Sequence, residues 1–598
     1  MDSIFRSWDS TNIIVRENRV SNSRFYFANP TKFSRFINRW DLLLLILIFS
    51  VLFFLGWAGS QMATPYQLGD QIPISLEPSN LPFYALRTVL RMFIALIFSI
   101  LFTFIVGALA AKNRRAEQII IPAIDILQSI PVLSFLSITV TGFIHLFPHS
   151  LLGPECASIF AIFSAQVWNM TFGFYQSLKT VPHDLIEVSA MFRLSAWQRF
   201  WKVEVPFSLS GLLWNMMVSM SASWFFVVLS EAISVAHQNI RLPGVGSYIA
   251  LAITQRDLHA VGYAILTMVI VIFLYDQILF RPLIAWSEKF KVEQSPDESE
   301  YQSWLIDLMR SSRLMKKVTE GLTVFTNGFV NARWLRMGDP KAVKEINYKK
   351  QKWWDRLWGG VVLIGVITGG WFLLKFILAE LKASDIFHVF LLGAATGTRV
   401  IILIALSSLL WIPVGVWIGL RPRLAQRIQP IIQFVAAFPA NLFYPLFVIA
   451  IVKFNLSVEI WVTPLMILGT QWYILFNVIA GASRIPRELY LAADNFGLKG
   501  WIWWKRLALP GIFPFYITGA ITAAGGAWNA SIVAEYVSWG NITLKATGLG
   551  EYIQASTSAG DFPQIALGTA MMCVYVLAFN RFIWRPLYRL AEERFNFN

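Results

Sequence analysis

Long apolar runs, separated by short polar connections, fill most of the chain. A helix of about 20 residues crosses the ~30 Å hydrocarbon core of a membrane, and the runs are close to that length or longer. Six runs precede a long polar stretch at 286–356, and six follow it. We therefore predict an all-α integral membrane protein with about 12 transmembrane helices. The predicted spans lie at 41–58, 88–111, 118–145, 157–178, 208–234 and 260–285, and again at 357–378, 389–420, 428–452, 457–480, 511–536 and 563–588.

The polar landmarks of the first six runs recur in the second six. A shift of 304 residues pairs Pro182 with Pro486 and Glu231 with Glu535, and upstream a shift of 308 pairs Arg91 with Arg399. A register held over many positions indicates an internal repeat, read here in the same direction in both copies. We expect four parts: an N-terminal segment at 1–40, a first membrane unit at 41–285, a linker at 286–356 and a second membrane unit at 357–598.

Composition and charge agree with a membrane location. Hydrophobic residues make up 56% of the 598 and charged residues only 14%, which is too little polar surface for a soluble chain of this length. The net charge is +15, and the Lys and Arg residues gather in alternate connections. Because such residues favour the cytoplasmic side, we place both termini and the 179–207 connection in the cytoplasm and expect no nucleic-acid partner.

The chain offers little that could support catalysis. Its two cysteines and six scattered histidines suggest neither a disulfide framework nor a metal site. No Gly-Lys dipeptide occurs, so the phosphate-binding loop of ATPases is absent from the sequence. We therefore expect a transport subunit without its own ATPase site, and a membrane enzyme is the weaker alternative.

The connections at 181–207 and 485–511 are the most informative repeated segments. Each reads as a short helix, a break and a second short helix, with Pro182 or Pro486 in the first turn and an acidic residue two positions later. Gly497 permits the break in the second copy. Aromatic residues then recur at helical spacing beside basic ones, so this helix offers a partner an apolar ridge. The ridge residues are Trp197 and Phe200 in the first copy and Trp501 and Trp504 in the second.

These segments resemble the EAA motif of ABC-importer permeases, in which Glu-Ala-Ala is followed by a glycine and by an aromatic stretch that ends at a proline. Arg193 replaces the glycine in the first copy, and Leu491 replaces the glutamate in the second. The resemblance implies coupling helices that dock in two ABC ATPase subunits, which use the ATP, and it implies no cofactor bound by this chain. The expected coupling residues are Asp184, Glu187, Trp197, Phe200, Pro206, Glu488, Gly497, Trp501, Trp504 and Pro510.

Within that superfamily, residues 85–290 and 390–595 resemble nitrate, sulfonate and taurine permeases. The signs are the duplicated intramembrane Arg, the Glu at a helix end and the Gly-x-Gly-x-Tyr-Ile element that begins at Gly244 and Gly548. The resemblance implies two tandem six-helix type I permease units in a bacterial inner membrane, a small organic or inorganic anion as substrate, and a periplasmic or lipid-anchored solute-binding protein. The alternatives are a fused permease for ferric iron or a thiamine-like solute and an ion-coupled secondary transporter.

Several paired residues are candidates for the substrate path, each with a structural alternative. The arginines could attract an anion, or they could snorkel or form ion pairs. The glutamates could line the path, or they could accept N–H bonds from the following Gly-x-Gly loop. The tryptophans and prolines could shape a cavity, or they could serve packing and kinks. The candidates are Arg91, Arg399, Glu231, Glu535, Pro131, Pro439, Trp168, Trp472, Trp224 and Trp528.

Overall fold

Helices build almost all of the first unit in the computed structural model, which describes residues 39–62, 64–66, 72–129, 132–235, 238–287, 304–332 and 348–594. A single antiparallel hairpin, β1 (Ala232–Val235) with β2 (Gln238–Arg241), interrupts the helices. The helices are α2 (Arg39–Met62), η2 (Pro78–Asn80), α3 (Leu81–Phe102), η3 (Thr103–Gly107), α4 (Ala108–Lys112), α5 (Arg114–Ser129), α6 (Val132–Leu146), α7 (Leu152–Lys179), α8 (His183–Met191), α9 (Ala196–Arg199), η4 (Phe200–Glu204), α10 (Val205–Ser230), α11 (Val245–Gln255), α12 (Leu258–Tyr275), η5 (Asp276–Phe280) and α13 (Arg281–Ser287).

The second unit repeats this order, with β3 (Tyr536–Trp539) and β4 (Ile542–Lys545) as its hairpin. Two linker helices, α14 (Trp304–Ser311) and α15 (Arg313–Val330), precede it. The helices of the unit are α16 (Tyr348–Leu378), α17 (Ala383–Gly419), α18 (Pro422–Ala437), η8 (Ala440–Phe443), α19 (Tyr444–Lys453), α20 (Val458–Ser483), α21 (Arg487–Asn495), α22 (Gly500–Trp503), η9 (Trp504–Ala508), α23 (Leu509–Ala534), α24 (Leu549–Ala559), α25 (Phe562–Phe579), η10 (Asn580–Trp584) and α26 (Arg585–Arg594).

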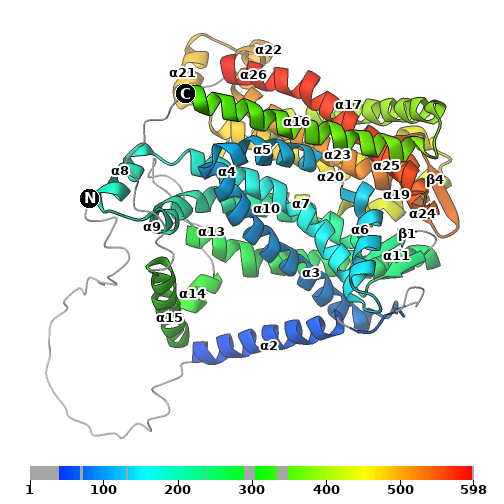
Figure 1. The fold of residues 1–598 in the computed structure, drawn as a ribbon, viewed down its shortest axis with the longest axis horizontal. Helices are drawn as coiled ribbons and strands as arrows, with labels where there is room; N and C mark the ends of the chain where they lie inside the picture. The colour runs from blue at the N-terminus through cyan, green and yellow to red at the C-terminus, as the bar shows by residue number, and fades with distance from the viewer. Residues whose placement is uncertain are drawn as a thin grey trace, which may run out of the picture.

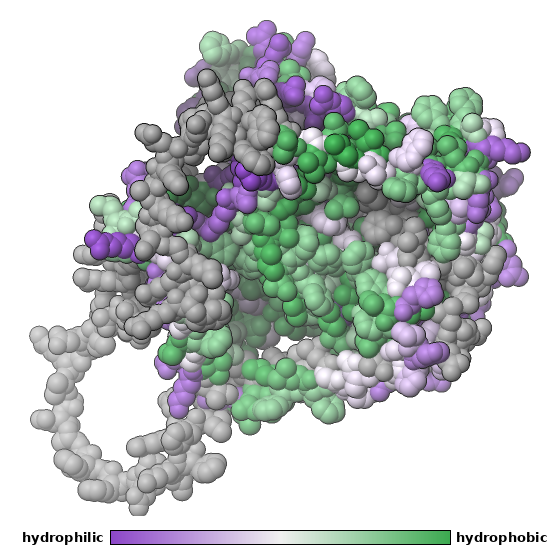
Figure 2. Space-filling view, viewed as in Figure 1, coloured by the Kyte–Doolittle hydropathy of each residue, from purple (hydrophilic) through white to green (hydrophobic). Residues whose placement is uncertain are grey.

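The described residues of each of the twelve predicted spans are mostly helical, which confirms the all-α membrane class. By length and composition, eight helices in the described part of the chain could cross a membrane, or nine if the bent pair α18 and η8–α19 counts as one span. The predicted spans outside this set correspond to α2, to α5 with α6, and to α7. Apolar side chains gather over the middle of the long helices, and hydrophilic ones lie toward the two ends (Figure 2).

Two predicted spans are broken rather than continuous, which corrects their prediction as single helices. The segment 118–145 is divided into α5 and α6, and 428–452 is divided into α18 and α19 with a bend of 70° between them. Pro439 sits directly before η8 with φ of −69°, as expected where a proline ends a helix. Pro131, its counterpart in the first unit, lies outside the described residues.

The repeated motifs lie at opposite ends of the long helices. The hairpins, with α11 and α24, lie at one end, whereas α8, α9, α21 and α22 lie at the other (Figure 1). The two units also interlock: α5 and α6 of the first pack against α25 of the second, and α18 of the second packs against α10 and α12 of the first. The interface between the repeats is therefore built from the broken helices.

Candidate functional site

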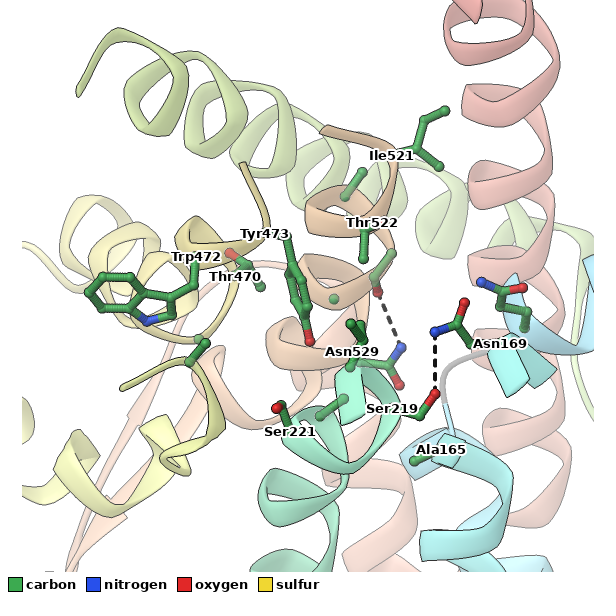
Figure 3. A pocket seen from close by; sticks show the side chains of 18 of the residues that line it. Ala165, Asn169, Ser219, Ser221, Thr470, Trp472, Tyr473, Ile521, Thr522 and Asn529 are labelled. Atoms are coloured by element: carbon green, nitrogen blue, oxygen red, sulfur yellow. Dashed lines mark hydrogen bonds between the residues drawn. The ribbon is translucent and has the colours of Figure 1, made fainter. Parts of the chain in front are cut away.

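A cavity of about 580 Å³ opens between the two units. Its main walls are α7 and α10 of the first unit and α20 and α23 of the second, which are equivalent helices in the repeat. Polar side chains from both sides face it, among them Asn169 and Ser219 opposite Tyr473 and Asn529 (Figure 3). Asn169 Nδ2 donates to Ser219 Oγ at 3.2 Å. Ser164 Oγ also lines the cavity and is buried without a hydrogen-bond partner among the described residues.

The cavity wall is almost uncharged. Hydroxyls, amides and aromatic rings make up its polar part, and the described residues of the lining include one acidic and one basic side chain, Asp125 and Arg484. Asp125 of α5 pairs across the units with Arg585 of α26, Oδ2 to Nη2 at 3.2 Å. At the start of α5, the hydrogen bond from Tyr175 Oη holds the pKa of the Glu117 carboxyl below its usual value. Both contacts anchor α5, one of the two helices that flank the break.

Asn529 joins the broken helix of the first unit to the second unit. Its Oδ1 accepts the backbone N–H of Val132, the first residue of α6, at 3.0 Å. Its Nδ2 donates to the Gly525 carbonyl within α23 at 3.2 Å. The amide therefore accepts a bond from a backbone N–H that has no partner within α6, because it lies at the N-terminus of that helix. Sequence reasoning missed Asn529, because the equivalent residue in the first copy is Phe225.

The predicted tryptophans divide between this wall and the core. Trp168, Trp472 and Trp528 line the cavity. Trp224 lies outside the cavity wall, only 1% exposed, with its ring packed edge-on against Tyr275 at 5.4 Å. Trp528 is equally buried and packs on Phe579, so only a small part of it can meet a solute.

Arg91 and Glu231 form a closed network at the hairpin end of the first unit. The Arg91 guanidinium donates to both oxygens of Glu155 at 2.6 and 2.7 Å and to Glu231 Oε1 at 2.6 Å. Thr88 Oγ1 donates to the same Glu231 oxygen at 2.6 Å, and the Gly246 N–H donates to the other at 2.7 Å. Arg91 and Glu231 are both 0% exposed. This geometry favours the ion-pair and loop-anchor alternatives over a place in the path.

The second unit repeats the network. Arg399 Nη1 donates to Glu535 Oε1 at 2.8 Å and to the Thr547 carbonyl at 2.8 Å, and its Nη2 pairs with Glu459. Thr396 and the Gly550 N–H bind the Glu535 carboxylate as Thr88 and Gly246 bind its counterpart. Glu459 is half exposed, unlike the buried Glu155. We call these two clusters the Arg–Glu latches.

The Gly-x-Gly element owes its glycines to close packing against the latch. A Cβ at Gly244 would come within 2.3 Å of the Glu231 carboxylate, and one at Gly246 within 2.0 Å of the Val228 carbonyl. Two pairs of latch residues that we did not predict could have been found from the sequence repeat. The shift of 304 also pairs Glu155 with Glu459, and the shift of 308 pairs Thr88 with Thr396.

The two predicted coupling segments have the expected form of helix, break and short helix. Pro182 and Pro486 occupy the N-cap positions of α8 and α21, one residue earlier than predicted, and Asp184 and Glu488 lie in the first turns. Gly497 adopts φ of +64° at the break, and Arg193 adopts φ of +50° at the equivalent position. The break therefore survives the loss of the motif glycine.

The predicted apolar ridges differ in exposure between the copies. Trp501 is 72% exposed, whereas Phe200 is buried, with Lys112 Nζ 4.4 Å from its ring centroid. The Trp197 ring packs against Phe329 of α15, with the centroids 5.3 Å apart. Glu187 is exposed, and its Oε1 lies 3.1 Å from His183 Nδ1. Trp504 is half-buried, and Pro206 and Pro510 are the second residues of the long helices α10 and α23.

The sequence analysis did not predict one exposed pair of phenylalanines, which lies at the ends of α8 and α21 in the coupling segments. Phe496 is 82% exposed and Phe192 is 58% exposed, and the shift of 304 pairs them.

Two segments of the chain, 103–281 and 411–584, match the family described as binding-protein-dependent transport system inner membrane component. The chain belongs to this family of inner membrane components. Together the matches cover more than half of the chain, one in each repeat, so the protein contains two units of the family in one polypeptide. In the described residues of these units, no group of three or more His, Cys, Asp or Glu side chains could hold a metal ion.

Curated relatives of this inner membrane component are permeases for small solutes. It is 25% identical over 189 residues to a bicarbonate transport system permease of Synechococcus elongatus, which is 32% of this chain and 65% of the relative. It is 27% identical over 202 residues to the taurine transport system permease of Escherichia coli, 34% of this chain and 68% of the relative. It is 24% identical over 190 residues to a nitrate import permease of Leptolyngbya laminosa, which is 32% of this chain and 64% of the relative. The chain thus spans slightly less than two-thirds of the bicarbonate and nitrate permeases and slightly more than two-thirds of the taurine permease.

Proposed function

We propose that this chain supplies both halves of the membrane channel of an ABC importer and passes a small anion through the cavity between its units. The observation that carries the proposal is that equivalent helices of the two repeats enclose this cavity. In this account two ATPase subunits dock at the segments around α8–α9 and α21–α22. A solute-binding protein delivers the substrate at the hairpin end.

The side chains that line the cavity support a translocation path that binds its solute weakly. Hydroxyl and amide groups replace part of the hydration shell of a small oxoanion, and fixed countercharges that would trap it are sparse. The volume exceeds that of bicarbonate, nitrate or taurine, so solute and water fit together. The relatives are permeases for bicarbonate, nitrate and taurine, which are two anions and a solute with an anionic sulfonate, and this supports an anion as substrate.

An ion-coupled secondary transporter fits the geometry less well. Such a protein couples through ionisable groups that its solute or ion can reach near the membrane midplane. Here the buried Arg and Glu side chains bind one another in the Arg–Glu latches, and none of them lines the cavity.

A fixed negative charge in the cavity tests the proposal. Asn169→Asp keeps the size of the side chain and reverses the bond that Asn169 donates to Ser219, because the carboxylate accepts from the Ser219 hydroxyl. Its charge opposes an anion by an energy equivalent to about 10- to 100-fold in rate. We expect uptake of labelled bicarbonate or nitrate by vesicles that contain the assembled complex to fall by that factor. Asn169→Ala, the matched neutral control, should have a smaller effect. Equal or faster uptake with Asn169→Asp would exclude an anionic substrate.

A further inference from the structure

The linker helix α15 has an apolar stripe that the rest of the described chain leaves largely open. Val318, Leu322, Phe325 and Phe329 follow one another at intervals of three or four residues and lie on one face. They are 54%, 59%, 71% and 41% exposed. The opposite face has Thr323 and Asn327. Burying such a stripe is favourable by the usual hydrophobic term, so the assembled protein needs something to cover it.

Both ends of α15 are attached to groups at the ends of membrane helices. At its start, Ser312 Oγ donates to Asp41 Oδ1 at 2.5 Å, and Asp41 lies in the first turn of α2. At its end, Phe329 packs against Trp197 and Trp201, and the Trp201 ring packs on Phe104 of η3 at 5.8 Å. The helix runs across the end of α2, along the face where α8 and α9 also lie (Figure 1).

We propose that α15 is an interfacial helix whose apolar stripe inserts into an anionic lipid surface. Its position at the helix ends and its orientation across α2 place it at the depth of the headgroups. Its sequence has three basic residues and one acidic residue, a charge that suits anionic lipid. Apolar residues on one face and polar residues on the other are typical of helices that lie in this plane.

The contact with the first coupling segment makes α15 a lipid anchor for that segment alone. Gln198 Nε2 donates to Asn331 Oδ1 at 3.0 Å, just beyond the end of α15. The second copy has Ile502 in place of Gln198 and Lys505 in place of Trp201, so it lacks the side chains that hold the linker. The anchoring does not depend on the transported solute or on the ATPase proposal.

Site-specific fluorescence on the full chain in vesicles tests the proposal. A polarity-sensitive label is placed at Phe325→Cys on the stripe or at the matched control Asn327→Cys on the opposite face, with Cys156→Ser and Cys573→Ser. If that background does not assemble, the signal is taken as the difference from the chain that keeps its native cysteines. The vesicles contain phosphatidylcholine alone or phosphatidylcholine mixed with phosphatidylglycerol.

We expect a blue-shifted emission, quenched by spin-labelled lipid, at position 325 and not at 327. The shift should increase with phosphatidylglycerol and lose that dependence in Lys316→Gln with Lys317→Gln. An aqueous spectrum at 325 in both vesicles would overturn the proposal. So would protection at 325 that appears only after ATPase subunits are added, since that result would assign the stripe to a protein partner.

Discussion

At the residue scale, Arg193 shows how a position can keep its backbone conformation after losing its glycine. Arg193 adopts the left-handed conformation at the break between α8 and α9, and Gly497 does the same in the second copy. A side chain in this region costs roughly 1–2 kcal/mol, and glycine avoids most of that cost. The first coupling segment is therefore strained where the second is not.

Relief of this strain should be measurable. We expect Arg193→Gly to raise the free energy of unfolding by about 1 kcal/mol, read as a higher melting temperature of the purified chain. Arg193→Ala removes the same charge but keeps a Cβ, so it serves as the control and should give no increase. If both variants stabilise the protein equally, charge rather than backbone strain is the cause.

The Arg–Glu latches make a second prediction at this scale. Glu231→Gln weakens a buried carboxylate that accepts bonds from Arg91, Thr88 and Gly246, and loss of a buried partner costs about 3–5 kcal/mol. We expect a clearly lower melting temperature. Glu459→Gln, at the half-exposed position, should cost less. An unchanged melting temperature with lowered uptake would instead place Glu231 in the substrate path.

The sequence located most latch members but could not decide their role. Arg91 and Glu231 are 140 residues apart, and only the fold shows that they bind each other rather than a solute. Asn529 has no equivalent amide in the first copy, so the repeat gave no signal for it. Residues that occur in both copies were therefore easier to find than Asn529, which occurs in only one copy.

At the element scale, the break between α5 and α6 is the feature that periodicity could not predict. Apolar residues continue through 118–145, so we expected one span, although Pro131 was a candidate for a cavity or a kink. The sequence analysis also did not predict the hairpins after α10 and α23. Each of their strands has only four residues, which is too short for a clear alternating pattern. The coupling segments were predicted better, since proline, glycine and acidic residues set their ends.

The link across the break gives a prediction for transport. Asn529→Ala removes the acceptor at the N-terminus of α6, at a cost of about 1 kcal/mol. We expect slower uptake with the ATPase subunits still bound. Asn477→Ala is the control, because Asn477 also lines the cavity but, among the described residues, bonds within its own helix, to the Tyr473 carbonyl. Equal effects of the two variants would assign the loss to the cavity wall rather than to the break.

The coupling segments give a prediction for docking. Exposed aromatic side chains commonly dominate an interface, at ~2 kcal/mol or more each. We expect Trp501→Ala and Phe496→Ala to release ATPase subunits from the purified complex. Trp197→Ala should have a weaker effect, because Phe329 already covers part of that ring. Glu187→Ala is the comparison, and a larger loss there than with Trp501→Ala would contradict our interpretation of the ridges.

At the scale of the whole molecule, the two units are alike in fold and unlike in surroundings. Both have an Arg–Glu latch at one end and a coupling segment at the other. The linker, however, contacts only the first coupling segment through Phe329 and Asn331 among the described residues. Fusion of the repeats thus gives one polypeptide two proposed docking surfaces with different surroundings. The repeat was visible in the sequence, whereas this asymmetry depends on where α15 lies.

The central claim is that one chain forms the whole membrane channel and docks two ATPase subunits. Native mass spectrometry of the complex purified from its own membrane tests this most directly. The account predicts one copy of this chain with two ATPase subunits, and loss of ATPase subunits when Trp501→Ala and Phe496→Ala are combined. A complex that contains two copies of this chain around one pair of ATPases, or a stable complex with none, would contradict it.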